Sequence, residues 1–309
     1  MRLLAVLFCV FVSTLSAYSY EAELAEEAAG AEAATNSCVH GFLDVTLKNA
    51  YVTPRGLLVA RNQFTTQVTT GLSLDLYKNT STFVNNVSLF GFIWNDIQGR
   101  QHDHYVGYWN ECDWGVGTNV TFAKHALFGV QFLEFLSPPH HFSTERNIEF
   151  LLAYDDSHLI APVSFQPYAK LFWTVSGDST VVTGKRGHTY DVELGLVPTW
   201  DLRTYGYGVT LTAPTWVTTG PANFWNGGKL GLKNERTKFG VFSTGLRSEI
   251  AISCIPKSLG SWYFDVGFQY YRLINDNLLQ AQTVTLGVPT RHQAHRNIYV
   301  ASAGIGFRF

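Results

Sequence analysis

Three pairs of histidines have the residue type and close spacing that could bind a transition metal, because imidazole is a common ligand of zinc, copper and nickel. The pairs are His102 and His104, His140 and His141, and His292 and His295. All three fall in long segments between the strands predicted below. No spacing fixes two imidazoles on one rigid element, which favours solvated loop histidines. We therefore expect no metal site and no cofactor.

The segment around the first pair also carries acid–base groups of the kind that hydrolases use, namely Asp96, His102, Asp103 and His104. A nucleophile needs its base within hydrogen-bond reach, and the sequence alone does not show such a contact. The chain contains neither a Gly-x-Ser-x-Gly nor a His-Glu-x-x-His motif. We expect a protein without enzymatic activity and keep a lipase or protease as an alternative.

The cysteines show no metal or disulfide framework. Cys9 lies in the N-terminal apolar segment, which leaves Cys38, Cys112 and Cys254 as an odd set spread along the chain. Our hypothesis is that Cys38 pairs with Cys254, because a flexible segment before Cys38 gives it reach.

The composition is unusual for a soluble domain. Only 15% of the 309 residues are charged and 15% are aromatic, whereas an average soluble domain is roughly a quarter charged. This composition excludes disordered, collagen-like and coiled-coil chains. A net charge of −2 gives no electrostatic reason to bind nucleic acid.

The chain divides into three parts. Residues 1–17 form a secretory signal peptide, with Arg2, an apolar stretch from Leu3 to Val12 and a small-residue cleavage site at Ala17. Residues 18–38 are rich in Ala and Glu with no apolar stripe, which predicts a mobile linker in the periplasm. Residues 39–309 form the folded domain. Beyond residue 17 no run of about 18 apolar residues predicts a transmembrane helix.

The folded domain shows strict alternation of apolar and polar residues. Val68, Leu72 and Leu74 share one parity, with Thr69 and Ser73 on the other. Period-two segments of about ten residues match tilted strands that cross a bilayer, although a soluble β-sandwich alternates as well. The predicted strands lie near residues 42–51, 64–77, 83–95, 112–122, 126–136, 147–154, 164–176, 188–197, 204–212, 238–253, 262–273 and 298–309.

The lengths of the connections favour the barrel over the sandwich. The long connections are predicted at 52–63, 96–111, 137–146, 177–187, 213–237 and 274–297. The shorter ones are predicted at 78–82, 123–125, 155–163, 198–203 and 254–261. Long and short connections that alternate along an even-stranded meander are typical of transmembrane barrels. The sequence therefore predicts an all-β fold, a closed antiparallel up-and-down barrel of about 12 strands.

The last predicted strand has a recognisable sequence pattern. Residues 297–309 alternate through Tyr299, Ala301, Ala303, Ile305 and Phe307 and end at Phe309. This segment resembles the C-terminal assembly signal of Gram-negative outer-membrane barrels, and the chain as a whole is more loosely similar to porin-type families. The resemblance implies an outer-membrane location, contact with outer-membrane lipid and recognition by the barrel-assembly machinery through the strand ending at Phe309. It carries over no functional residue.

The charged residues that alternate with the lipid-facing ones are the candidate pore-lining residues. Eight of them are acids and four are bases. They are Asp44, Lys48, Asp75, Asp113, Glu149, Lys170, Asp191, Glu193, Arg247, Glu249, Asp265 and Arg308. Two interpretations remain open for them. They form either a network of ion pairs that fills the barrel, or an aqueous lumen with a mild preference for cations.

We expect a porin-like channel for passive diffusion of small hydrophilic solutes, with both termini in the periplasm. A structural barrel with an occluded lumen is the non-enzymatic alternative. The segments 213–237 and 274–297 are the candidates for a constriction.

The outer face carries two further predictions. Glu134 shares the lipid-facing parity, which requires it to lie near an interface, and several aromatic residues are candidates for interface girdles. These aromatics are Trp114, Trp173, Tyr190, Tyr205, Tyr207, Trp262 and Phe309.

Overall fold

A computed structural model describes residues 38–99, 108–140, 142–176, 188–225 and 238–309. The predicted signal peptide and nearly all of the predicted linker lie outside the described residues. Within the described part, no helix is long and apolar enough to cross a membrane.

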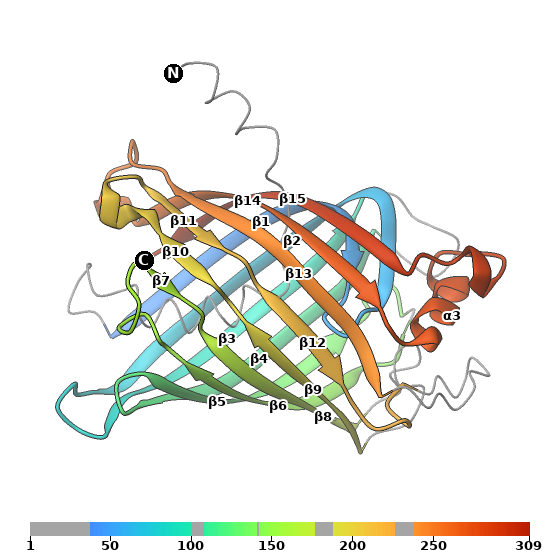
Figure 1. The fold of residues 1–309 in the computed structure, drawn as a ribbon, viewed down its shortest axis with the longest axis horizontal. Coiled ribbons are helices and arrows are strands. Elements are labelled where there is room, and N and C mark those ends of the chain that lie inside the picture. The colour runs from blue at the N-terminus through green and yellow to red at the C-terminus, as the bar shows by residue number, and fades with distance from the viewer. Residues whose placement is uncertain (1–37, 100–107, 141, 177–187, 226–237) are drawn as a thin grey trace.

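The described chain is mostly β-strand, and each spanning strand pairs antiparallel with its neighbours (Figure 1). The first six strands are β1 (Val39–Val52), β2 (Leu58–Lys78), β3 (Val84–Gln98), β4 (Trp109–Phe122), β5 (Ala126–Leu136) and β6 (Glu145–Tyr154). The last three are β13 (Phe239–Ala251), β14 (Ser261–Leu273) and β15 (Asn297–Arg308). β1 pairs with both β2 and β15, which closes the sheet into a barrel.

The three remaining spanning strands are each interrupted at the same level. Their pieces are β7 (Val163–Ser164) with β8 (Pro167–Ser176), β9 (Thr189–Leu196) with β10 (Thr199–Asp201), and β11 (Val209–Thr212) with β12 (Thr215–Thr219). Pro198 and Pro214 lie in two of the breaks, where a residue without an N–H cannot continue the ladder. The pairing continues across the breaks, so the barrel has 12 spanning strands, as the sequence predicts.

Predicted boundaries are wrong in three places. The short connection predicted at 198–203 contains the strand β10 (Thr199–Asp201). The ninth strand is not 204–212, because residues 202–205 form a 3-10 helix (η2, Leu202–Tyr205) that Asp201 caps at its N-terminus, and the strand runs from Val209 to Thr219. The long connection predicted at 52–63 is a turn of residues 53–57, because β1 and β2 both extend further than their apolar alternation shows.

The two ends of the barrel differ in their connections (Figure 1). We call the end that holds Phe309 and the turns at 79–83, 123–125 and 252–260 the terminal end. The other end, which we call the mouth, holds the turn 53–57 and the segment between β14 and β15. That segment contains the helix α3 (Asp276–Thr285) and a 3-10 helix η5 (Arg291–Gln293). A further 3-10 helix, η4 (Lys257–Leu259), lies in the 252–260 turn.

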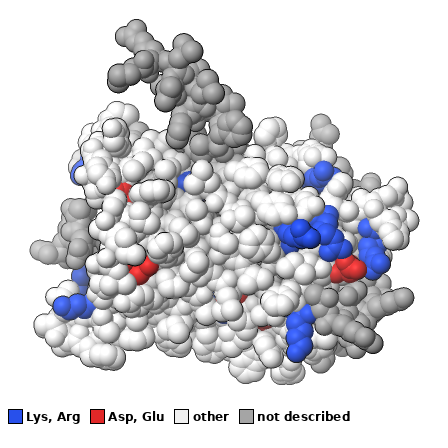
Figure 2. Space-filling view, viewed as in Figure 1, with Lys and Arg blue, Asp and Glu red and all other residues white. Residues whose placement is uncertain are grey.

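The outer wall is apolar, as the alternation predicts. In β2, Leu72, Leu74 and Leu76 are exposed on the outer face, whereas Thr69 is buried inside. Most of the charged atoms on the face shown in Figure 2 lie toward its two ends, and its middle is nearly free of them. A charge facing lipid at mid-membrane is costly, so this band is suited to a bilayer core.

Aromatic side chains lie on the outer wall at both ends. Trp173 and Tyr190 are exposed cross-strand neighbours toward the mouth, and Tyr205, Tyr207 and Phe309 are exposed at the terminal end. Trp114 and Trp262 are half-buried. This distribution is that of two interface girdles.

Glu134 keeps its outward position through local partners. The Arg146 guanidinium donates to Glu134 with an Nε–Oε2 distance of 2.5 Å, and the Trp114 indole N–H donates to its Oε1 at 3.3 Å. Glu134 lies two residues from the mouth end of β5. The interface position expected for it is therefore consistent with the structure.

Candidate functional site in the barrel lumen

All twelve predicted pore-lining residues occupy inward positions on the strands. Eight are buried: Asp44, Lys48, Glu149, Lys170, Asp191, Glu193, Arg247 and Asp265. Four are half-buried, namely Asp75, Asp113, Glu249 and Arg308. The alternation of each strand places them there, because successive side chains point to opposite faces. That they line a water-filled path stays a prediction.

In the terminal half of the lumen, charged side chains form a packed network near the barrel seam. Arg308 donates two hydrogen bonds to Glu249, at 3.1 and 2.9 Å. Its guanidinium carbon lies 4.1 Å from the ring centre of Tyr263, and the Tyr263 hydroxyl donates to Asp44. The Arg308–Glu249 and Tyr263–Asp44 contacts join strands that are next but one, and the Arg308–Tyr263 contact joins adjacent strands. They reinforce the wall, in agreement with the ion-pair interpretation.

The structure adds four inward charges that the sequence analysis placed in connections: Arg55, Asp96, Glu111 and Glu145. Asp96 is fully buried and accepts hydrogen bonds from Thr65, Gln98 and Asn110. The missed signal was the polar parity of Asp96 and Gln98, which continues the inward face of β3.

Arg55 is the most informative of the four, because its side chain crosses the lumen. Its Nη1 donates to Oε1 of Glu145 on β6 at 2.8 Å. Its guanidinium carbon lies 5.3 Å from the ring centre of Phe135 on β5 and 5.9 Å from that of Phe172 on β8. In the strand order, β6 and β8 lie on the opposite side of the barrel from β1 and β2. The turn 53–57 therefore folds into the lumen and bridges it.

The turn owes its shape to local sequence. Gly56 N–H donates to Thr53 C=O at 2.8 Å, and Leu57 N–H donates to Thr53 Oγ1 at 3.0 Å. Gly56 has φ of +88°, a conformation that costs little only for glycine. A Cβ built there would lie 2.9 Å from Cδ1 of Leu278 on α3. The turn and the helix are therefore in close contact.

An apolar cluster surrounds this contact at the mouth. It joins the turn to α3, the segment after β12, and the ends of β13 to β15. The Thr285 hydroxyl donates to Leu58 C=O at 2.6 Å, and the Asn277 amide donates to Trp225 C=O at 2.7 Å. We call this the mouth cluster; its members include Tyr51, Leu57, Leu58, Trp216, Phe224, Trp225, Val241, Tyr271, Leu273, Leu278, Leu279 and Ile298.

The mouth cluster contains residues from both segments that the sequence analysis expected to form a constriction. Phe224 and Trp225 from 213–237 and Leu278 from 274–297 are in the cluster, and residues 226–237 lie outside the described part. Both segments therefore support the turn, while the side chain that spans the lumen comes from the turn itself.

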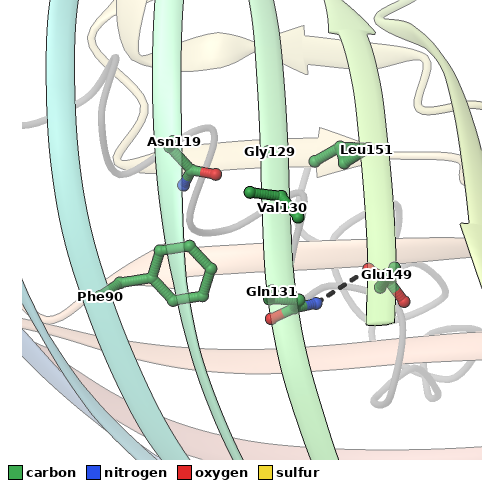
Figure 3. Close-up of a pocket in the computed structure, with 7 residues that line it drawn as sticks. All are labelled: Phe90, Asn119, Gly129, Val130, Gln131, Glu149 and Leu151. Atoms are coloured by element: carbon green, nitrogen blue, oxygen red, sulfur yellow. Dashed lines mark hydrogen bonds between the residues drawn. The ribbon is translucent and has the colours of Figure 1, made fainter. Parts of the chain in front are cut away.

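A small pocket lies on the inner wall between β3 and β6 (Figure 3). Gly129 opens it, because it has no side chain there. The Gln131 amide donates to Oε1 of Glu149 at 2.8 Å, so the charged group in the pocket has a partner. The lining consists of Phe90, Asn119, Gly129, Val130, Gln131, Glu149 and Leu151.

The described histidines do not converge on a metal site. His292 is exposed. Burial, and then the contact with Arg61, lowers the pKa of His295. His140 is exposed, whereas His102, His104 and His141 lie outside the described residues. Among the residues that the structure describes, no group of three His, Cys, Asp or Glu side chains could hold a metal ion.

The structure also places the acids of the hydrolase alternative and the three cysteines. Asp96, proposed for the hydrolase alternative, is buried among hydrogen-bond donors, and Asp103 falls outside the described part. Cys38, Cys112 and Cys254 all carry free thiols, so the structure does not contain the hypothesised disulfide.

A closed antiparallel barrel with an apolar outer band, aromatic girdles and a charged interior is an outer-membrane β-barrel. No family model matches the chain, and no curated protein matches it. Among solved structures, an outer-membrane channel from Pseudomonas putida F1 matches with 10% identity and a TM-score of 0.48, over 89% of this chain and 97% of that one.

Two other matched structures are of the same general kind. The translocator domain of the autotransporter NalP from Neisseria meningitidis shares 11% identity over 94% of this chain and 95% of that one, with a TM-score of 0.43. The KdgM porin shares 6% identity over 87% and 99%, with a TM-score of 0.41. The function of this chain is therefore inferred from its own side chains.

Proposed function

We propose that the chain is a passive outer-membrane channel for small hydrophilic solutes, with a mild preference for cations. The observation that carries the proposal is the lumen, in which charged side chains from all around the wall face inward behind an apolar outer band. Charged groups on that face require water or partners. The proposal includes an N-terminal signal peptide, a Gram-negative source and both termini in the periplasm.

The excess of acids supports the cation preference. Acids outnumber bases among the inward residues, and Asp96, Glu111 and Glu145 add to the excess while Arg55 offsets one charge. Rings of carboxylates favour cations in channels. The lumen therefore repels anions more than it repels cations of the same size.

The mouth limits what passes. Barrels of about eight strands are filled by side chains and those of about sixteen or more leave a wide channel, so twelve lies between. The Arg55–Glu145 pair crosses the lumen, with 2.8 Å between Nη1 of Arg55 and Oε1 of Glu145. We therefore propose a narrow channel whose conductance is set by the turn 53–57.

Planar-bilayer recording tests the proposal. Purified, folded chain is expected to give small discrete current steps in potassium chloride. Under a salt gradient, the reversal potential is expected to have the sign of a cation-selective channel. The absence of steps from protein shown to be folded by its heat-modifiable gel mobility would contradict the channel, and an anion-selective potential would contradict the preference.

A structural barrel with an occluded lumen is the second candidate, because many inward side chains are fully buried. Thr65, Asp96, Asp191 and Gln269 have no exposed surface. An occluded barrel predicts no current from the wild-type chain and none after removal of the Arg55–Glu145 pair. A channel predicts current in both.

We also propose that the chain has no enzymatic activity and is recognised by the barrel-assembly machinery through its last strand. Phe309 exchanges backbone hydrogen bonds with Gly41, so the last residue lies at the seam. Deletion of Phe309 is expected to reduce the folded chain in outer membranes without affecting secretion to the periplasm. Lipase or protease activity lost in H102A or H104A variants would contradict the non-enzymatic assignment.

A further inference from the structure

A row of buried oxygen atoms crosses three neighbouring strands near the mouth. Asn147 on β6 is the register partner of Thr174 on β8, and Thr174 is in turn the partner of Thr189 on β9. The exposed fractions of the three residues are 0%, 0% and 1%. Asn147 Oδ1 and the two threonine hydroxyls make no hydrogen bond within the described part of the chain.

Asp191 extends this row on the same inward face of β9, two residues from Thr189. It is fully buried, and neither of its carboxylate oxygens has a hydrogen-bond partner among the described residues. An isolated buried carboxylate is costly. Together with the three oxygens of the row, the two carboxylate oxygens of Asp191 make five buried oxygen atoms on this part of the inner wall that no described residue satisfies.

The charges around Asp191 leave an excess of negative charge. The Arg55 guanidinium is close enough to interact electrostatically with Asp191, but its hydrogen bond goes to Glu145. Glu193, the next inward residue of β9, is the register partner of Lys170 and accepts a hydrogen bond from the Tyr168 hydroxyl at 2.7 Å. Arg55 also faces Glu145 and Glu111, so three acids share this one base and negative charge is in excess.

We infer that Asp191, Thr189, Thr174 and Asn147 form a binding site for a hard cation, with Ca²⁺ as its best match. All the donors are oxygens, which hard cations prefer, and Ca²⁺ takes six to eight oxygen ligands in flexible geometry. Water completes the coordination. The site goes beyond the proposed channel, because a cation bound here does not require an open lumen.

Asp191 is the one charged ligand of the proposed site, and this sets the expected strength. Calcium sites with few charged ligands bind in the range of about 10⁻⁴ to 10⁻³ M. We expect one site of that strength, far weaker than a site formed by several carboxylates.

Calorimetric titration with calcium chloride tests the site, using the full folded chain in detergent after removal of divalent ions. The wild-type chain is expected to bind one Ca²⁺ per molecule. Asp191→Asn, which keeps the shape and removes the charge, is expected to weaken binding at least tenfold. Asp75→Asn is the matched control, because Asp75 is an inward acid that already accepts a hydrogen bond from the Asn86 amide at 3.1 Å; its binding is expected to equal that of the wild type.

Two further variants keep the test decisive if Asp191→Asn does not fold. Thr174→Val and Thr189→Val retain all charges and are each expected to weaken binding several-fold. Calcium binding that is unchanged in Asp191→Asn or in both threonine variants would overturn the site. Absence of binding to the wild-type chain at about 10 mM calcium, above the weak end of the range, would overturn it as well. Neither result depends on conductance, so failure of the site is distinguishable from failure of the channel.

Discussion

The two halves of the lumen use ion pairs in opposite ways. In the terminal half, Arg308 and Glu249 join strands that are next but one, and the pair follows the wall. At the mouth, Arg55 and Glu145 join opposite sides of the barrel, and the pair crosses the lumen. The chemistry is the same in both places. The position of the partners around the barrel decides whether a pair strengthens the wall or obstructs the lumen.

The halves also differ in what supports them. The terminal network lies on strands, whose hydrogen-bonded neighbours fix each side chain. The Arg55 bridge depends on a turn that leaves the wall and is held by the mouth cluster. The mouth should therefore be the half that responds most to loss of packing.

The largest effect is expected from Leu278→Ala, because Leu278 is 2% exposed in the mouth cluster and packs against the turn. Removing a buried leucine side chain costs about 2–5 kcal/mol. Urea unfolding of the chain in lipid vesicles measures the loss. Leu259→Ala at the terminal end, where the side chain is exposed, is expected to change the free energy of unfolding little. Equal losses in the two variants would remove the contrast between the halves.

Removal of the bridge is expected to change conductance several-fold. The double variant Arg55→Ala/Glu145→Ala removes both partners of the bridge together, and we expect larger unit steps in planar bilayers. The wall pair gives the control, because Arg308→Ala/Glu249→Ala removes the same charges from the other half. If the control variant enlarges the steps as much as the bridge variant, the bridge is not what limits passage.

A smaller effect is expected from Gly56→Ala, and it separates backbone strain from packing. Gly56 and Gly206 both have positive φ, +88° and +82°. An added Cβ meets Leu278 at Gly56 but finds nothing within 4 Å at Gly206. Both alanines carry a backbone cost of about 1 kcal/mol or more, so Gly56→Ala should lower the free energy of unfolding further than Gly206→Ala. Equal costs would show that the turn is not packed against α3.

The smallest effect concerns pH at the mouth. Burial and the Arg61 guanidinium lower the pKa of His295 below its ordinary value of about 6.5. The folded state thus favours the neutral imidazole, and its contribution to stability is complete above pH 6.5 and declines as the pH falls through the window down to the lowered pKa. Hydrogen exchange of residues 276–296 is expected to quicken on acidification. A His295→Gln variant should show no such change, and the same acceleration in both would exclude His295 as the cause.

Much of the barrel could be predicted from local pattern. Alternation in β2 and β14 identifies the lipid face directly, because one parity is largely apolar through the middle of each strand. The interrupted strands were harder, since Pro198 and Pro214 read as loop signals although the pairing continues past them.

The inward charges within strands were found by parity, whereas the bridge was not. Arg55 belongs to a turn, and no periodicity describes how a turn leaves the wall. Its partner Glu145 starts a strand that looked shorter in sequence, and the contact joins residues 90 positions apart. Only the closure of the barrel brings them together.

The closing seam between β1 and β15 has a consequence for the order of assembly. The two strands are paired from Phe42 and Arg308 to Lys48 and Ser302, after which the Asn49 side chain accepts from Ala301 N–H, a contact between residues 252 positions apart. The entropy of closing so long a loop grows only slowly with its length, by about 0.6 kcal/mol per doubling. The time needed to find such a distant partner is nonetheless long. Until it is found, the first and last strands are open edges that other chains can join.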